Sequence, residues 1–469
     1  MDKELPADAA DHHGYIKAFD GDHPSPRPRK PGRTQKQRQE LPEAIELLLK
    51  TVKHFLPRLS ASMNRLPDPR NGWQSVYHQA HLLWLGILLF MMHLGSRRQL
   101  RFERLADAFE LNLALLSGQH DLDFIADPDT LAYYAEHVQV SALEKLLAAI
   151  TVRLIRMKAF DPFRLYGYFT VAIDGSQVCT FEHEPWPGCP HRELSTGKTQ
   201  YFAYVLDAKL VTPCGMALTL ATEMLTNEGN ENFDKQDCEL KAFPRLVEKL
   251  RQLFPRTAFC LLLDSLYANQ NVIRLIETNQ WKYTITFKEG SMPERFNETL
   301  SLASMQKDNR LRVNEENIAQ SFQWVEQLPI AEFTPNVLFC REQQQDKEAT
   351  TFVWLTNFNL NRNNVQNIAK KGGRLRWKIE NEGFNVQKND GYEMEHPYSE
   401  HQNGFRIFYI LLLIAYYITQ LILHGSLIQA LAKSFGSAKN FARRLAESLR
   451  NHLVPADLAL PGQIRFRPP

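Results

Sequence analysis

The stretch Tyr168-Phe169-Thr170-Val171-Ala172-Ile173-Asp174 marks a change in the hydrophobic pattern of this chain. Before it, apolar residues recur at helical spacing, whereas from here they follow the period of about 2 that is typical of a strand. The strand is expected to end at Asp174, because Gly175 and Ser176 follow. The chain therefore divides into an all-helical N-terminal part and a later part that is built on a sheet.

The segments after Asp174 alternate between strand and helix patterns. Further strands are expected at Tyr201–Val211, Met216–Leu225, Ala258–Leu263, Trp281–Phe287 and Phe352–Asn357, and helices at Leu240–Phe254, Gln270–Glu277 and Arg376–Lys388. Up to residue 287 the order is three strands, helix, strand, helix, strand, which predicts a mixed α/β sheet that begins with a meander. The ribonuclease H-like architecture has this order, so we expect a ribonuclease H-like core.

Composition places few limits on function. The 469 residues are 44% apolar and 23% charged with a net charge of +2, so a nucleic-acid partner requires locally gathered positive charge. Six cysteines without a Cys-x-x-Cys pair, and a polar N-terminus, predict a reducing intracellular compartment. Cys189 and His191 could be two zinc ligands or part of a plain loop.

A long uncharged stretch near the C-terminus has two interpretations. From Ile407 to Ala432 there is no Asp, Glu, Lys or Arg, and the apolar heart Ile407–Leu423 has 17 residues. This length is at the lower limit for a membrane span. A buried helix is favoured, because the stretch also contains Gln420 and Gln429.

Three carboxylates stand where a phosphodiester-cleaving site would need them. Asp174 and Asp264 each end an apolar strand pattern, and Glu380 lies on a later basic helix. Two divalent ions about 3.5–4 Å apart can activate the attacking oxygen and stabilise the leaving oxygen of a phosphodiester. Because Mg²⁺ prefers carboxylate oxygens, the three residues predict a two-metal site. Asp237 and Glu239 form another acidic cluster, interpreted as helix-start residues or as a supporting part of the site.

The segment Arg376-Trp377-Lys378-Ile379-Glu380 resembles the core of a known signature. DDE-class bacterial insertion-sequence transposases, the IS4-like ones in particular, carry their last catalytic glutamate in Tyr-x2-Arg-x3-Glu-x6-Lys. Ile173-Asp174-Gly175-Ser176 and Leu263-Asp264-Ser265 resemble their two aspartate motifs. The resemblance covers roughly residues 165–430, and implies that Asp174, Asp264 and Glu380 are catalytic and bind Mg²⁺, with Mn²⁺ as a substitute.

The chain departs from this signature at both ends. The tyrosine position is Gly373, and the lysine position is Gln387, with Lys388 one residue later. Glu382 is a second candidate for the glutamate, and on an α-helix it lies about 200° around from Glu380.

Glu380 is favoured, because it lies four residues after Arg376. With Phe384 and Lys388, which continue this spacing of four, the two residues form one ridge of a helix. The resemblance implies that this ridge binds DNA phosphates through Arg376 and Lys388, with Arg374 and Lys378 as further DNA-binding residues. An i,i+4 ion pair between Arg376 and Glu380 is the structural alternative.

The function that the resemblance implies is DNA transposition. Water would cut the element end and free a 3′ hydroxyl, which would attack target DNA, or the opposite strand to form a hairpin. The implied partners are the terminal inverted repeats, target DNA and a second copy of the chain, in the bacterial cytoplasm and without a membrane.

Composition sets the expected domain boundaries. Residues 24–39 carry six Lys or Arg, four prolines and no acid, which indicates an arm that either contacts DNA phosphates or is simply solvated. We predict a flexible basic arm at 1–40, a helical domain at 41–160 that binds DNA or, as the alternative, only packs, and the first part of the core at 161–290. A β-rich insertion subdomain is predicted at 291–350, with short β pieces at 320–327 and 337–341, followed by the second part of the core at 351–430 and a basic C-terminal helix and tail at 431–469.

Three alternatives to a transposase stay open from the sequence. The chain could be a host-adopted ribonuclease H-like nuclease that cuts DNA without transposing. It could be a catalytically inactive DNA-binding regulator of transposition. It could also be a membrane-associated protein that is built around residues 407–432.

Overall fold

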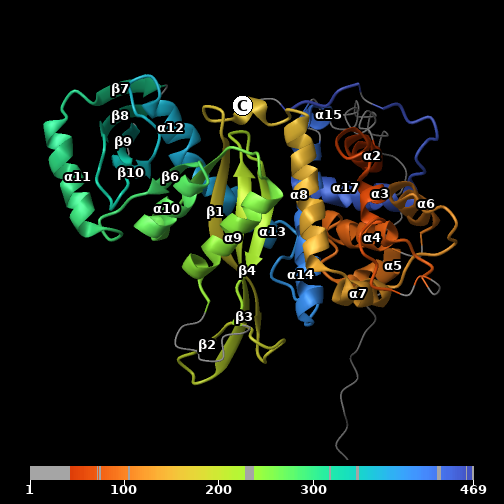
Figure 1. The fold of residues 1–469 in the computed structure, drawn as a ribbon. Coiled ribbons are helices and arrows are strands. Elements are labelled where there is room, and N and C mark those ends of the chain that lie inside the picture. The colour runs from red at the N-terminus through yellow and green to blue at the C-terminus, as the bar shows by residue number, and fades with distance from the viewer. Residues whose placement is uncertain are drawn as a thin grey trace, which may run out of the picture. The chain divides into compact units, whose positions relative to one another are not determined.

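A mixed sheet of ten strands is the centre of the fold (Figure 1). The computed structural model describes residues 43–70, 72, 75–103, 106–227, 237–315, 318–344, 348–429, 435–460 and 462–466. The expected basic arm at 1–40 lies outside these residues. The strands are β1 (Phe169–Phe181), β2 (His191–Glu193), β3 (Thr199–Val211), β4 (Ala217–Met224), β5 (Phe259–Leu263), β6 (Lys282–Thr286), β7 (Arg310–Glu315), β8 (Ile318–Val325), β9 (Asn336–Gln344) and β10 (Thr350–Thr356).

The first half of the sheet has the predicted order of elements. β1, β3 and β4 form an antiparallel meander, and β5 and then β6 lie parallel to β1 on its other side. Helix α9 (Glu239–Leu253) follows β4, and α10 (Gln270–Thr278) connects β5 to β6. α9 is strongly amphipathic, with Phe243, Leu246 and Leu250 buried, which explains why its periodicity was visible in the sequence.

Strand β1 differs from its prediction. It does not end at Asp174 but continues through Gly175 to Phe181, paired with β3 along its length. The register shifts between Gln177 and Cys179, which indicates a bulge that bends the strand. The glycine that signalled a strand end is instead required inside the strand, because a Cβ at Gly175 would lie 2.4 Å from Oε1 of Glu239.

The region expected as a β-rich insertion continues the same sheet. β10 lies antiparallel to β6, and β9, β8 and β7 follow outward in that order. The strand predicted at Phe352–Asn357 is β10, and the short β pieces predicted in this region belong to β8 and β9. Helix α11 (Pro293–Met305) and strand β7 were not predicted, because their sequences are mostly polar and half-exposed.

The expected helical region is present and packs with helices from the end of the chain (Figure 1). Asn112 on α6 donates to the backbone carbonyls of Leu449 and His452, which joins the N-terminal helices to the C-terminal one. The helices before the sheet are α2 (Ala44–Phe55), α3 (Leu59–Met63), α4 (Gln79–Met91), α5 (Leu100–Glu103), α6 (Asp107–Ser117), α7 (Pro128–His137) and α8 (Val140–Arg156). Those after it are α12 (Val365–Lys371), α13 (Asn385–Asn389), α14 (Gln402–His424), α15 (Ser426–Gln429) and α17 (Ala438–Asn451).

Helix α14 is the buried helix expected from the uncharged stretch. It is long and apolar enough to cross a membrane, yet 89% of an 18-residue apolar segment of this helix is buried within the protein. It contacts α2, α4, α7, α8 and strand β4. Gly86 allows α4 to approach closely, because a Cβ there would lie 2.7 Å from Cδ1 of Leu411. Burial against these elements accounts for its composition.

The segment Arg376–Lys388 is not the regular α-helix that was expected. A 3₁₀ turn (Gly373–Trp377) leads into a π-helical turn (Ile379–Phe384) and then into α13. A π turn takes more residues than an α turn, so positions four apart do not stay on one ridge. The ridge argument for Glu380 was therefore wrong, and the position of each side chain has to be taken from its contacts.

Candidate active site

The parallel pairing of β1 and β5 brings the two predicted aspartates together. Ala172 pairs with Leu262, so Asp174 and Asp264, each two residues further on, occupy corresponding positions of neighbouring strands. Neighbouring strands lie about 4.8 Å apart, and residues at corresponding positions of two such strands point to the same face of the sheet. The carboxylate of Asp264 accepts the backbone N–H of Leu266 at 2.9 Å, which fixes its direction at the end of β5.

Arg376 contacts Asp174 rather than Glu380. Its Nη1 lies 3.1 Å from Oδ2 of Asp174, and both side chains are largely buried, at 15% and 21% exposed. The i,i+4 pair between Arg376 and Glu380, which was the structural alternative, is not formed among the described residues. The contact ties the 3₁₀ turn directly to the centre of the sheet.

Burial raises the pKa of Asp174 to about 6. Arg376 lowers the pKa, whereas the nearby carboxylates of Glu239 and Asp264 raise it further. The carboxyl group is thus surrounded by more negative charge than one guanidinium neutralises.

Glu239 is a third acidic neighbour, and the sequence did not identify it clearly. Its carboxylate accepts the phenol of Tyr204 and, at 3.0 Å, that of Tyr267. Burial, together with this carboxylate, raises the pKa of both phenols. A glutamate in the first turn of a helix is locally favourable, so its position did not reveal that two distant tyrosines direct it toward β1. Its partners support the second of the two interpretations of the acidic cluster.

A cavity of about 870 Å³ opens beside these residues and includes Glu380. Glu380 is exposed and lines the cavity with Asp264. Glu382 does not line it, and forms an ion pair with Lys378. The remaining lining is Ser265, Thr286, Phe287, Lys288, Glu289, Phe296, Thr351, Phe352, Val353, Trp354, Gly373, Arg374, Arg376, Trp377 and Asn381.

The four basic residues that the resemblance implied for DNA are in different environments. Arg376 and Arg374 line the cavity, and the Arg374 guanidinium lies 4.0 Å from the ring centre of Phe352. Lys378 is paired with Glu382, and Lys388 lies 3.0 Å from Glu395. Arg376 thus contacts one of the candidate carboxylates, whereas Arg374 lies 3.8 Å from Glu342.

Both departures from the signature have a packing reason. A Cβ at Gly373 would lie 2.2 Å from the ring of Trp354, so no larger side chain fits there. Gln387 is fully buried and accepts a hydrogen bond from Nζ of Lys209 at 3.2 Å. A lysine at 387 would place a second ammonium group beside the first one.

Lys209 itself forms a buried ion pair on β3. Its Nζ lies 2.7 Å from Oδ2 of Asp207, and both side chains are 0% exposed. Thr219 accepts from the same ammonium group at 2.9 Å, and Tyr409 of α14 donates to Asp207 at 2.8 Å. Burial lowers the pKa of Lys209, which Asp207 counteracts. This network joins the sheet to α14 and to the segment that carries Glu380.

Within the described ranges, no group of three or more His, Cys, Asp or Glu side chains is close enough to hold a metal ion as the side chains stand. As these side chains stand, Asp174, Asp264 and Glu380 therefore do not form such a group. The two residues that were considered as zinc ligands have other contacts. Cys189 is buried with its Sγ 3.5 Å from the carbonyl oxygen of Phe202, and the His191 ring lies against the ring of Tyr201.

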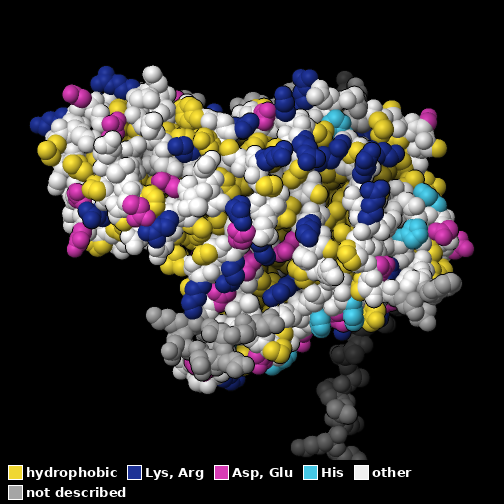
Figure 2. Space-filling view, viewed as in Figure 1, with side chains coloured by type: hydrophobic (Ala, Val, Ile, Leu, Met, Phe, Trp, Pro, Cys, Tyr) yellow, Lys and Arg dark blue, Asp and Glu magenta, His cyan; other side chains and the backbone are white. Residues whose placement is uncertain are grey.

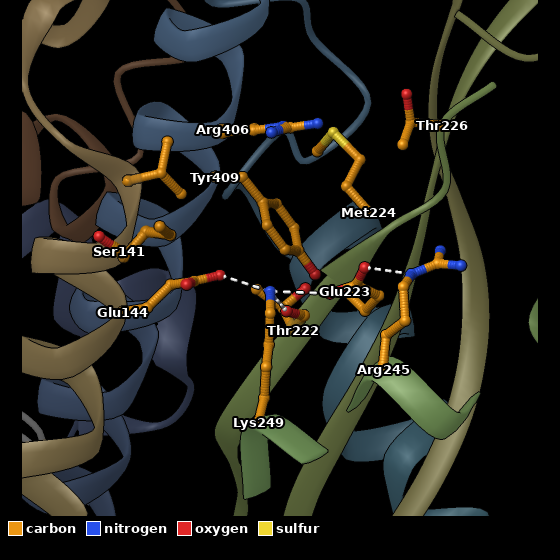
Figure 3. A pocket seen from close by; sticks show the side chains of 12 residues that line it. Ser141, Glu144, Thr222, Glu223, Met224, Thr226, Arg245, Lys249, Arg406 and Tyr409 are labelled. Carbon is orange, nitrogen blue, oxygen red and sulfur yellow. Dashed lines mark hydrogen bonds and ion pairs between the residues drawn. The ribbon is translucent and has the colours of Figure 1, made fainter. Parts of the chain in front are cut away.

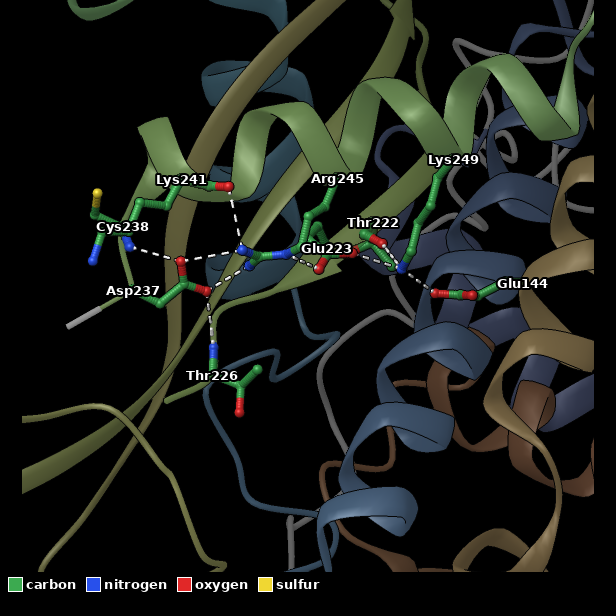
Figure 4. A network of polar contacts seen from close by, with 9 residues as sticks. All are labelled: Glu144, Thr222, Glu223, Thr226, Asp237, Cys238, Lys241, Arg245 and Lys249. Carbon is green, nitrogen blue, oxygen red and sulfur yellow. Dashed lines mark hydrogen bonds and ion pairs between the residues drawn. The ribbon is translucent and has the colours of Figure 1, made fainter. Parts of the chain in front are cut away.

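A second cavity of about 400 Å³ lies between α8, β4, α9 and α14 (Figure 3). Lys249 contacts Glu144 and Glu223, each at 2.8 Å, and Arg245 contacts Glu223 at 2.7 Å (Figure 4). Arg245 also pairs with Asp237, two residues before Glu239. The charged groups in this network of ion pairs neutralise one another. The network therefore connects α8 to the start of α9 and has no unpaired charge of its own to offer a ligand.

No protein-family model matches the chain, and no curated protein matches its sequence.

Asp174→Asn is expected to become more stable relative to the wild type as the pH rises from 4 to 7. A carboxyl group with a pKa of about 6 in the folded protein, instead of 3.8, resists ionisation, so the wild type loses stability as the unfolded chain ionises first. At about 1.36 kcal/mol per pH unit the relative gain is about 3 kcal/mol. Urea unfolding of both proteins without divalent cations measures it, and a difference that is constant with pH would contradict the raised pKa.

Proposed function

We propose that this protein is a DDE-class DNA transposase of an insertion sequence, acting in the bacterial cytoplasm. The observation that carries the proposal is the juxtaposition of Asp174 and Asp264 on paired strands, beside the cavity that contains Glu380. Asp174 lies within β1 and Asp264 directly follows β5, and the third carboxylate comes from a separate segment, Glu380 in the π turn.

The strand order supports a ribonuclease H-like core within the larger sheet. Along β4, β3, β1, β5 and β6 the first three strands are antiparallel and the last three are parallel. The aspartates lie on its two central strands, β1 and the end of β5. The strands β7 to β10 extend this core, and they supply part of the cavity wall through Phe352 and Trp354.

Asp174, Asp264 and Glu380 would hold Mg²⁺. Their oxygens are the ligands that Mg²⁺ prefers. Burial is the main cause of the raised pKa of Asp174, and the carboxylates of Glu239 and Asp264 add to it, so a cation bound there would favour the charged form. Bound there, Mg²⁺ supplies activation of the attacking oxygen and stabilisation of the leaving oxygen.

The residues of the chain position the DNA. Arg376 and Arg374 present guanidinium groups to the cavity, and these suit bidentate contact with a phosphate. Arg376, which pairs with Asp174 in this structure, could instead bind a phosphate oxygen of the substrate. A water oxygen then forms the new bond to phosphorus while the bond to the 3′ oxygen breaks, which leaves a 3′ hydroxyl on the element end and a 5′ phosphate on the flank. The 3′ hydroxyl attacks target DNA, or it attacks the opposite strand and forms a hairpin. Cutting two element ends together requires at least a homodimer.

The test is cleavage of labelled DNA that carries the inverted repeats flanking the gene, with Mg²⁺ or with EDTA. Wild type is expected to cut at the repeat ends and to join them to target DNA only with Mg²⁺, and Asp264→Asn is expected to do neither. Metal-dependent cutting without preference for the ends would favour the host-adopted nuclease. Binding of the ends without any cutting would favour the inactive regulator and overturn the proposal.

A further inference from the structure

We infer that a groove along α8 and the end of α9 is a second DNA contact that binds the phosphate backbone without reading sequence. The inference rests on the proposed function, since it takes DNA as the polyanion. The groove has a volume of about 680 Å³. Its cations are Lys145, Arg153 and Arg156, and its apolar floor includes Ala149, Val152 and Leu253.

The three cations lie along one face of a single helix. At about 100° per residue, Lys145, Arg153 and Arg156 fall within an arc of about 80°, and Lys145 and Arg156 are about 16 Å apart along the axis. One DNA strand advances about 3.4 Å along the duplex axis per phosphate. The row of cations is thus long enough to follow several successive phosphates.

The charge of the groove is uncompensated. No acidic side chain of the described residues lines it. The acids nearest in sequence are engaged elsewhere, since Glu144 pairs with Lys249 and Glu248 pairs with Arg251. All three cations are exposed, and the side chains of Lys145 and Arg156 make no ion pair with the described residues. Figure 2 shows Lys and Arg side chains gathered over the part of this face where Figure 1 places the end of α8.

The lining also determines what kind of contact is made. No aromatic side chain of the described residues lines the groove, so bases have no surface on which to stack. Ala148 and Ala149 are small, which lets a phosphate backbone approach the helix. Gln252 is the one amide in the lining, and it donates to Glu248. The contact is therefore electrostatic, as in sequence-independent binding.

The experiment measures binding of the full-length protein to a duplex of random sequence, without the element ends, as a function of salt. The variant is Lys145→Gln/Arg153→Gln/Arg156→Gln. The matched control is Arg251→Gln/Arg274→Gln/Lys370→Gln, which removes the same charge from exposed side chains already paired with Glu248, Glu332 and Glu315. Because Arg153 also contacts the Phe55 carbonyl, the double variant Lys145→Gln/Arg156→Gln is tested beside the triple one.

Each lost phosphate contact reduces the slope of log K against log salt by about 0.9. Between 50 and 200 mM salt, the triple variant is thus expected to lose about 40-fold less affinity than the wild type, and the control is expected to behave as the wild type. Equal slopes for wild type and both groove variants, or an equal change in the control, would overturn the inference. Cleavage at the ends separates the two proposals: cutting with unchanged slopes refutes only the groove, whereas a reduced slope without cutting refutes only the transposase.

Discussion

Glu380→Gln is expected to slow Mg²⁺-dependent strand cleavage by about 10²–10³-fold or more, whereas Glu382→Gln is expected to cut at nearly the wild-type rate. A loss of about 10²–10³-fold is typical when one group that stabilises charge in the transition state is removed. Glu380 is exposed in the cavity that also contains Asp264. Glu382 is held by Lys378 outside that cavity, in a half-exposed pair of a kind that contributes about 0–1 kcal/mol.

The two variants are matched, because each removes one charge from the same π turn without changing side-chain size. Single-turnover cleavage of the labelled end substrate measures both, and binding of the same DNA in EDTA shows that substrate is still bound. Loss of cutting in Glu382→Gln with retention in Glu380→Gln would mean that the other glutamate reaches the aspartates. The transposase proposal would survive that result, but the assignment of its third carboxylate would not.

Lys209→Met is expected to lower the free energy of unfolding by about 3–5 kcal/mol, the cost of leaving a buried charge without its partner. Asp207 and Lys209 are both 0% exposed, and Lys209 contacts Oδ2 of Asp207, while Oδ1 has no hydrogen-bond partner among the described atoms. Tyr409 and Thr219 cannot supply the missing charge. The double variant Asp207→Leu/Lys209→Met should recover much of the loss, because apolar replacement of a buried pair is often close to neutral.

Urea unfolding monitored by circular dichroism measures these changes. Lys370→Met is the control, since Lys370 is 65% exposed and lies 3.4 Å from Glu315, so its loss should cost about 0–1 kcal/mol. A cost for Lys209→Met no larger than that of the control would show that the pair is not buried as described.

Periodic patterns predicted most of the frame. The strands β3, β4, β5 and β6 and the helices α9 and α10 were expected within a few residues, because each has a clear apolar period, and α14 was expected from its lack of charge. The start of β1 was expected, but its end was not. The continuation of β1 past Asp174 was missed because Gly175 signals a turn locally. The side chains of Glu239 and Tyr204, both further along the chain, make a glycine necessary there.

The proximity of the two candidate aspartates was predictable, but the contacts around them were not. Asp174 and Asp264 follow from the apolar runs that precede them, and their pairing follows from the sheet order. The π turn was missed, because nothing in the spacing of residues 379–384 distinguishes it from an α turn. It depends on tertiary neighbours, such as Lys209 against Gly383 and the Tyr416 hydroxyl on the carbonyl of Glu382. The contact of Arg376 with Asp174 comes from the 3₁₀ turn before it, which the sequence did not predict either.

The central position of α14 has a consequence for synthesis on the ribosome. Helices α2 to α8 are complete at residue 156, but the helix that covers their apolar faces begins at Gln402. At about 5–20 residues per second, the growing chain waits roughly 10–50 s between these points. During that time α4, whose residues are all buried in the finished protein, lacks its main partner. A product truncated before Gln402 would therefore be a substrate for chaperones and proteases and not a folded fragment that competes for DNA.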